Sequence, residues 1–372
     1  MAIQTSHVGS LPRSQKVVDY IFAREKGENY NKIEFDQVMT EAVNDTVRKQ
    51  KKAGITIVSD GETSKISYAT YVKDRYHGFA GDSPRNAPAD LKKFPNYLQK
   101  LANDGGTPKY ARPMCVSKLE PKNNDDLIKD IDNLKKALQD NNIKKGFMNA
   151  ASPGVISLFL QNEYYPSREY YLEALSNLMQ TEYEKIVSSG LDLQIDCPDL
   201  ALSRHMLFND MTDDEFIKVA SINIESLNNA LRNIPKEKIR IHICWGNYEG
   251  PHVCDISISK MFETLMDVKT GHILFEAANP RHAHEWEVFE EKKNLIPDDL
   301  ILMPGVIDTT TNFVEHQNLV MQRLKNFTSI VGNDRVIGSS DCGFGTFAGF
   351  GTIDPDIAYE KLKVLAEGAA KV

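Results

Sequence analysis

No stretch of this chain carries about 18 consecutive apolar residues, so no membrane-spanning helix is predicted. The sequence also lacks an excess of positive charge, because 44 Lys and Arg stand against 52 Asp and Glu, for a net charge of −8. That balance argues against nucleic acid or an acidic membrane as a partner. The first residues show no basic segment followed by an apolar one, and we expect a cytoplasmic protein.

Cysteine is scarce and odd in number, with five in 372 residues. An odd set in a long chain argues against a disulfide framework and favours a reducing compartment with free or metal-binding thiols. No Cys-x-x-Cys pair occurs, so a zinc-finger type of structural site is not expected. We interpret Cys115, Cys197 and Cys254 as ordinary packing residues, which leaves Cys244 and Cys342 for chemistry.

Short apolar runs alternate with longer helical stretches along the whole chain. Strands are predicted to start or centre at Ile3, Ile55, Phe147, Leu191, Ile239, Ile273, Leu300 and Arg335. Eight β units that alternate with helices are typical of an α/β fold, the (β/α)8 TIM barrel, which needs about 250 residues and grows by insertions. We predict one catalytic domain over residues 1–372, with residues 63–142 as an excursion inserted after the second strand. A doubly wound, two-domain fold is the alternative.

Helices are predicted over residues 35–53, 124–140, 168–188, 213–231, 284–293 and 315–330, and a hairpin around residues 110–116. In a TIM barrel the active site lies at the C-terminal ends of the strands. Polar and reactive side chains fall at those ends, and they could converge on one pocket although they span nearly the whole chain. They are His7, Ser10, Asp60, Glu62, Ser152, Asp196, His242, Cys244, Glu276, Asp308, Asp341 and Cys342.

The apolar run 239–247 presents a histidine and a cysteine two positions apart. Side chains at i and i+2 of a strand point to the same face, so His242 and Cys244 can approach one metal ion together. Glu276 and Cys342 each stand where another apolar run stops, and would complete the site. Two thiolates, an imidazole and a carboxylate select zinc. Because zinc keeps a bound thiol deprotonated, we predict a thiol substrate.

Each of these residues also has a simpler structural interpretation. A lone His242 would more often be a core histidine, Cys342 a small buried hydrophobe, and Glu276 a helix cap. Asp308 could be only an N-cap ahead of the following helix. We favour the metal site because His242 and Cys244 occur together and Cys342 is available.

Several motifs spread over the chain occur together in one enzyme family. They are His242-x-Cys244, Glu276, Asp341-Cys342-Gly343, Val8-Gly9-Ser10-Leu11-Pro12-Arg13, Asp60-Gly61-Glu62 and Gln194-Ile195-Asp196-x-Pro198. Together they resemble the catalytic C-terminal barrel of cobalamin-independent methionine synthase, in its single-domain subgroup. The resemblance covers nearly the whole chain.

The resemblance implies a zinc-dependent thiol S-methyltransferase that moves a methyl group from methyltetrahydrofolate, or another donor, to homocysteine and so makes methionine. It implies zinc ligands at His242, Cys244, Glu276 and Cys342. It also implies that the amino acid part of the thiol is held by Val8, Gly9, Ser10, Glu62 and Asp196. Arg112 and Pro113 are expected near the methyl donor, and Trp245, which adjoins the metal site, on the same side.

The leaving group of such a transfer needs a proton, and His7, Asp308 and His316 are candidate general acids. The chain departs from the family pattern at Cys197 and Leu202, where members that bind homocysteine carry acidic residues. A tryptophan expected beside residues 151–155 is also missing. The segment 244–252 resembles zinc enzymes that add coenzyme M to epoxides, so an epoxyalkane:coenzyme M transferase is the alternative S-alkyltransferase.

Two further function classes stay open on the sequence alone. One is a metal-free, decarboxylase-like enzyme of the same barrel type, and the other is a non-catalytic partner of a zinc or cobalamin protein. For an enzyme, the expected partners are a small-molecule thiol and a methyl or alkyl donor, with no nucleic acid and no membrane. The oligomeric state is open.

Overall fold

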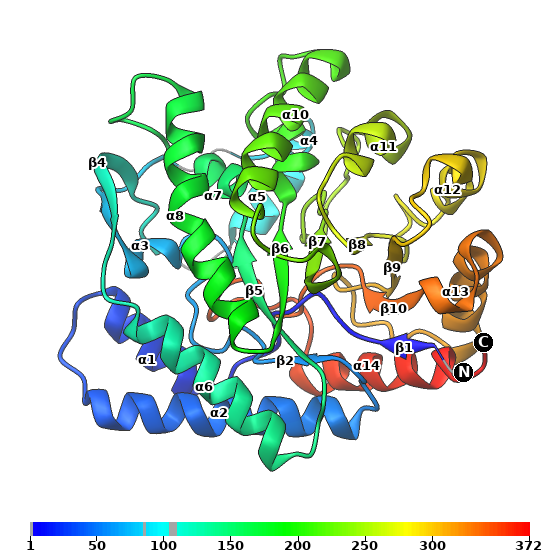
Figure 1. The fold of residues 1–372 in the computed structure, drawn as a ribbon, viewed down its shortest axis with the longest axis horizontal. Coiled ribbons are helices and arrows are strands. Elements are labelled where there is room, and N and C mark those ends of the chain that lie inside the picture. The colour runs from blue at the N-terminus through cyan, green and yellow to red at the C-terminus, as the bar shows by residue number, and fades with distance from the viewer. Residues whose placement is uncertain (1–2, 85–86, 104–109) are drawn as a thin grey trace.

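Eight parallel strands form the centre of the molecule in this computed structural model, which describes residues 3–84, 87–103 and 110–372 (Figure 1). In spatial order they are β1 (Gln4–Thr5), β10 (Ile337–Ser340), β9 (Ile301–Ile307), β8 (His272–Phe275), β7 (Ile239–His242), β6 (Asp192–Asp196), β5 (Gly146–Ala151) and β2 (Val58–Ser59). This order confirms the predicted (β/α)8 fold, since the strands follow one another around the sheet as they do in the sequence.

Backbone hydrogen bonds join the two ends of this strand order. The amides of Thr56 and Ile57 donate to the carbonyl oxygen of Thr5, at 3.2 and 3.0 Å. The Thr5 amide in turn donates to Thr56 Oγ1 at 2.8 Å. The segment before β2 therefore lies against β1, which brings residues following both strands to one end of the barrel.

Helices surround the strands, and most lie where the sequence predicted them. The longer ones are α1 (Gln15–Glu25), α2 (Lys32–Lys52), α6 (Asp125–Asp140), α8 (Arg168–Ser188), α10 (Asp213–Ala230), α11 (Ile258–Met266), α13 (Gln317–Val331) and α14 (Pro355–Ala369). The shorter ones are α7 (Pro153–Phe159), α9 (Ser203–Met206) and α12 (Trp286–Glu291), with 3-10 turns at Pro198–Leu200, Lys236–Lys238, Lys293–Leu295 and Asn333–Arg335. Local signals fix their ends: a capping box between Thr212 and Glu215 opens α10. Within the described part of the chain, no helix is both long and apolar enough to cross a membrane.

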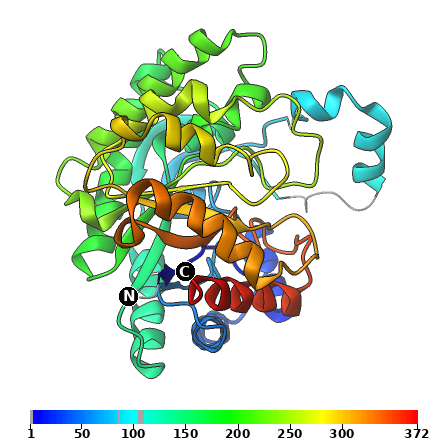
Figure 2. The same cartoon turned by 90° about the vertical axis from the view of Figure 1, so that its right-hand side faces the viewer.

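The chain between β2 and β5 holds the predicted excursion. It contains α3 (Val72–Arg75), α4 (Ala89–Lys92), α5 (Pro95–Asn103) and the antiparallel pair β3 (Tyr76–Ala80) and β4 (Met114–Pro121). Residues 85–86 and 104–109 of the excursion lie outside the described residues. Figure 2 shows α4 and α5 standing off from the barrel. By contrast, α6 packs along α2, where Thr40 Oγ1 donates to Asn133 Oδ1 at 2.8 Å, and so belongs to the ring of helices.

Polar side chains inside the barrel hold the end of β1. Arg240 is buried, with its guanidinium 3.8 Å from the centre of the Phe147 ring. It donates from Nη2 to Ser6 Oγ at 2.9 Å and to the His7 carbonyl at 3.2 Å, while burial lowers its pKa to about 9. Arg240 thereby fixes the start of the loop that follows β1 from inside the barrel.

Candidate metal centre and active site

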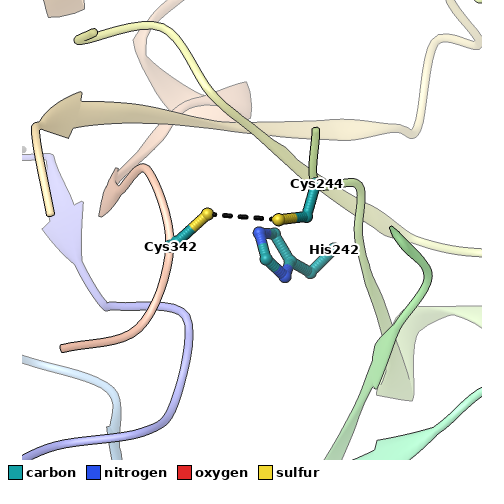
Figure 3. Close-up of side chains that lie close together, drawn as sticks. All are labelled: His242, Cys244 and Cys342. Carbon is teal, nitrogen blue, oxygen red and sulfur yellow. Dashed lines mark hydrogen bonds between the residues drawn. The ribbon is translucent and has the colours of Figure 1, made fainter. Parts of the chain in front are cut away.

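His242, Cys244 and Cys342 converge at the C-terminal ends of β7 and β10 (Figure 3). One ligand atom from each lies within 4.8 Å of the other two, and all three side chains are buried. The two sulfur atoms are 3.4 Å apart. The strand itself ends at His242, so Cys244 reaches the cluster from the following loop and not, as the i, i+2 argument assumed, from the same strand face.

Glu276, the fourth expected ligand, lies just after β8 beside Cys342, outside the group of three residues whose ligand atoms lie within 4.8 Å of one another. Its Oε1 is 3.6 Å from Cys342 Sγ and accepts a hydrogen bond from the Trp245 amide at 2.9 Å. Its Oε2 accepts from Asn279 Nδ2 at 2.7 Å. The carboxylate is thus held at the edge of the cluster by a residue next to Cys244.

Asp196 orients His242. Its Oδ1 lies 3.1 Å from His242 Nδ1, and its Oδ2 accepts from Asn149 Nδ2 at 3.0 Å. A carboxylate on one imidazole nitrogen fixes the ring and the tautomer, which leaves the other nitrogen for a metal ion. The remaining nitrogen, Nε2, faces the Asp341 carbonyl at 3.2 Å on the Cys342 side.

Asp341 organises the loop that carries Glu276. Its Oδ1 accepts from the amides of Ala277 and Ala278, both at 2.9 Å, and its Oδ2 accepts from the Asn279 amide at 2.8 Å. Because Asp341 directly precedes Cys342, this one side chain ties the loop after β8 to the loop after β10. It thereby sets the separation between Glu276 and Cys342.

Electrostatics at the cluster favour a cation. The hydrogen bond to Cys244 raises the pKa of the Cys342 thiol well above its usual value, and burial and the nearby Glu276 and Asp341 act in the same direction. For Cys244 the hydrogen bond from Cys342 lowers the pKa, but burial and Glu276 outweigh it, and the pKa is raised. Two thiols, an imidazole and a carboxylate in a buried group are the donor set that suits zinc.

Val8, Gly9 and Ser10 line the loop after β1 and lie against this cluster. The Val8 carbonyl accepts from Asn149 Nδ2 at 2.9 Å, and a Cβ at Gly9, whose φ is +144°, would come within 2.3 Å of Asn149 Oδ1. A Cβ at Gly343 would lie 1.9 Å from Ser10 Oγ. The two glycines therefore allow the β1 loop to approach both Asn149 and the residue that follows Cys342.

Unpaired acceptors surround the same loop. Glu62 is 1% exposed, its φ is 55°, and its Oε2 has no hydrogen-bond partner among the described residues. Asn149 Oδ1 and Gln194 Oε1 are also buried without one. Burial raises the pKa of Glu62 to about 7, although Lys65 opposes that shift. Such a group of oxygens suits a ligand with several N–H donors.

Known proteins with a similar sequence or fold include methionine synthases. No protein-family model matches the chain. It is 25% identical to a methionine synthase of Thermococcus kodakarensis over 368 residues, which covers 98% of this chain and 92% of the relative. A B12-independent methionine synthase from Shewanella sp. W3-18-1, solved in complex with selenomethionine, has the same fold, with a TM-score of 0.71 at 20% identity over 99% of this chain and 97% of that one. Over nearly its whole length the chain is therefore similar in sequence to a methionine synthase, and it shares the fold of a B12-independent methionine synthase.

Another relative of comparable similarity has a different named activity. The 2-hydroxypropyl-CoM lyase of Xanthobacter autotrophicus is 23% identical over 404 aligned positions, covering 99% of this chain and 94% of that protein. Both kinds of relative span the chain almost from end to end. Relatives with two different named activities, methionine synthase and 2-hydroxypropyl-CoM lyase, are therefore about equally similar to this chain.

On the expected donor side, aromatic rings gather around Arg112. Its guanidinium is 5.3 Å from the Phe159 ring centre, and the Tyr68 ring lies 5.9 Å from Phe159 and 6.1 Å from Phe347. Burial and the neighbouring Cys244 raise the pKa of Tyr68, so this group adjoins the metal cluster. Pro113 is buried beside Arg112.

Trp245 does not lie on that side. Its indole is 0% exposed, donates from Nε1 to the Ile256 carbonyl at 2.6 Å, and packs on His282 with ring centres 4.4 Å apart. The expectation of a donor contact is corrected to a packing position behind the cluster.

The three candidate general acids fare differently. His7 is 0% exposed with Nε2 2.7 Å from Gln50 Oε1, and burial lowers its pKa to about 4, so near neutral pH the ring is uncharged and offers no imidazolium as the acid. His316 is an exposed N-cap that accepts from the Asn318 amide. Asp308 accepts from Thr310 and Thr311, and the adjacent Thr309 bonds Asn247, whose Nδ2 donates to the Gly343 carbonyl at 2.7 Å. Through Thr309 and Asn247, the Asp308 loop reaches Gly343, the residue that follows Cys342.

Proposed function

We propose that the protein is a zinc-dependent S-methyltransferase that transfers a methyl group, from methyltetrahydrofolate or another donor, to the thiol of homocysteine to give methionine. The observation that carries this is the approach of His242, Cys244 and Cys342 within 4.8 Å, with Glu276 at 3.6 Å from Cys342. A zinc ion held by these four residues would keep the substrate thiol in its nucleophilic thiolate form. The names of the relatives support the choice of reaction.

The other side chains bind and orient the substrate. An amino acid thiol brings an ammonium group, which the unpaired Glu62 Oε2 and the nearby Asp196 carboxylate would accept. The backbone of Val8, Gly9 and Ser10 is fixed by Asn149 and Ser340 and would present its polar groups to the same ligand. Arg112, which lies among the Tyr68, Phe159 and Phe347 rings, would face the methyl donor. All five cysteines are free, which suits the reducing cytoplasm that we propose as the location.

An epoxyalkane:coenzyme M transferase is the second candidate. It is favoured by the residues at two positions near Asp196, where Cys197 and Leu202 are buried and carry no negative charge. Coenzyme M has a sulfonate in place of an ammonium group and would gain nothing from acids there. The relative from Xanthobacter autotrophicus points the same way.

Metal content and thiol choice test the proposal directly. The purified protein should hold about one zinc ion per chain, and homocysteine should change the zinc edge absorption spectrum by adding a sulfur ligand. A panel of homocysteine and coenzyme M, each assayed with methyltetrahydrofolate, methylcobalamin and a small epoxide, would identify the pair that reacts. Absence of zinc, or a spectrum that no thiol alters, would refute the metal-dependent reaction.

Glu62 should link substrate binding to pH. Its pKa is raised from 4.5 to about 7, so the folded state binds this proton more tightly than the unfolded one, and stability falls as pH rises between those values. Glu62→Gln should therefore raise the free energy of unfolding by about 2 to 3 kcal/mol at pH 8 and leave it nearly unchanged at pH 4.5. The same variant should bind homocysteine more weakly, because the ammonium loses its anion.

Chemical denaturation at both pH values, with homocysteine binding measured alongside, checks this prediction. Glu290→Gln is a matched control, since Glu290 is exposed and should change neither quantity. Equal free energies of unfolding for wild type and Glu62→Gln at pH 8 would show that burial of the ionised Glu62 carboxylate does not destabilise the protein.

A further inference from the structure

A second buried group of titratable side chains lies behind the metal cluster. Asp255 stands at its centre, with Oδ2 3.0 Å from both His252 Nδ1 and His282 Nε2. His205 Nδ1 approaches the other oxygen, Oδ1, at 3.4 Å. The Asp255 and His205 side chains are each 1% exposed, and that of His282 is 3% exposed. One carboxylate thus faces three imidazoles in the protein interior.

His282 is held from both sides. Nε2 bonds Asp255, and Nδ1 lies 2.7 Å from Glu285 Oε2. Since a carboxylate only accepts, both ring nitrogens donate, and the ring is an imidazolium. Burial lowers its pKa, but the bonds to Asp255 and Glu285 outweigh this and raise the pKa to about 10. The ring orientation is fixed, because each nitrogen has one partner.

The face of this ring lies against Trp245. The two ring centres are 4.4 Å apart with an interplanar angle of 34°. The two rings are tilted and not stacked, but a cation close to the face of an indole is still attracted to it. The same indole donates to the Ile256 carbonyl at 2.6 Å, and the Trp245 amide donates to Glu276 Oε1 at 2.9 Å. The contacts therefore run without a gap from Asp255 to the Glu276 carboxylate.

We propose that His282, clamped by Asp255 and Glu285, is a positioning residue for the metal centre, acting through Trp245 on the Cys244–Trp245 peptide and on Glu276. The proposal rests on the metal site of the proposed function. Burying ionised groups costs several kcal/mol, and an apolar side chain could fill the same space beneath the indole. The network fixes one residue that is both the neighbour of Cys244 and the hydrogen-bond donor to Glu276, and such outer partners set metal affinity.

Metal affinity, measured apart from activity, tests the role of His282. Zinc binding by competition with a chelator, and the absorption spectrum of the cobalt-substituted protein, would be compared between wild type and His282→Gln. We expect about 10- to 100-fold weaker zinc binding and a changed cobalt spectrum, since loss of an outer partner has effects of that size. Glu285→Gln keeps an oxygen for the Ile258 amide at 2.9 Å and should show a smaller change in the same direction.

His205→Gln is the matched control, because it removes another buried imidazole from Asp255 without touching Trp245. Its zinc affinity should stay within a factor of about two of wild type, a difference below 0.5 kcal/mol. If His205→Gln and His282→Gln lost zinc affinity equally, and in proportion to the fall in their melting temperatures, the network would contribute only to stability. That result would overturn the proposal. Wild-type affinity in both His282→Gln and Glu285→Gln would also overturn it. Failure of the wild type to bind zinc would instead refute the proposed function.

Discussion

Replacing Cys342 with serine is expected to abolish zinc binding at physiological metal concentration and nearly all activity. Serine keeps the size of the side chain but offers a hydroxyl that stays protonated, so one of the two thiolates 3.4 Å apart is lost. Removing a ligand should exceed the effect of removing an outer partner, so the affinity should fall by more than about 100-fold. Activity should fall by about 1000-fold, which corresponds to several kcal/mol of lost metal catalysis.

Metal analysis after dialysis and a methyl-transfer assay measure both effects. Cys115→Ser is the matched control: Cys115 is equally buried, but its sulfur faces the Ser117 carbonyl, an acceptor that a hydroxyl can also use. That variant should keep zinc and activity. Full zinc content in Cys342→Ser would remove Cys342 from the ligand set, whatever happened to the rate.

The convergence of His242, Cys244 and Cys342 could be predicted because the sequence signals for it are local and repeated. His242, Cys244 and Cys342 each stand at or just after the end of an apolar run, and a parallel barrel brings such ends together whatever their distance in sequence. Their convergence agrees with that reasoning even though β7 ends before Cys244. The fold could be predicted for the same reason. Strands and helices alternate along the chain, and the hydrophobic period that distinguishes them is set by neighbouring residues.

What the sequence could not supply were partners fixed only by the tertiary structure. His7 has the position of a catalytic residue, but Gln50, 43 residues later, occupies its Nε2. Asn149 binds Asp196 across 47 residues, and no spacing rule links an amide to a carboxylate at that separation. His282 and Asp255 lie after the segment 244–252 in the sequence, and neither belongs to a recognisable motif. Their role depends on the contact between His282 and Trp245.

The segment 63–142 also makes long-range contacts that its sequence does not predict. Its polar composition led to the prediction of an insertion over residues 63–142, but α6 within that range packs on α2 like the other outer helices. Helix α4 contacts the loop after Cys244 through Asp90, whose Oδ2 accepts from Tyr248 at 2.7 Å. Helix α5 contacts the same loop through Tyr97, whose hydroxyl donates to the Glu249 carbonyl at 2.6 Å. Composition identifies an insertion, but the contacts that give it a function are long-range.

Gly305→Ala is expected to destabilise the protein by about 3 kcal/mol or more and to weaken zinc binding. A Cβ at Gly305 on β9 would lie 2.3 Å from Asp341 Oδ1, 2.5 Å from Asp341 Cα and 2.7 Å from its amide nitrogen. Backbone atoms cannot rotate away as a side-chain tip can, so Asp341 must move. That movement would break its bonds to Ala277 and Ala278 and displace Cys342, because these residues are consecutive or directly bonded.

Gly338→Ala on the adjacent strand β10 separates this effect from the general cost of adding a methyl group. The atoms nearest to its Cβ would be the side-chain ends of Leu365 and Leu324, at 3.2 and 3.4 Å, which can give way. Thermal unfolding should show a loss of about 1 kcal/mol or less for this control, and zinc affinity should be kept. If Gly305→Ala lost stability but bound zinc as tightly as Gly338→Ala, then Asp341 would not set the separation of Glu276 and Cys342. A parallel loss of both properties in Gly305→Ala alone would make the close packing of β9 on Asp341 a requirement of the metal centre.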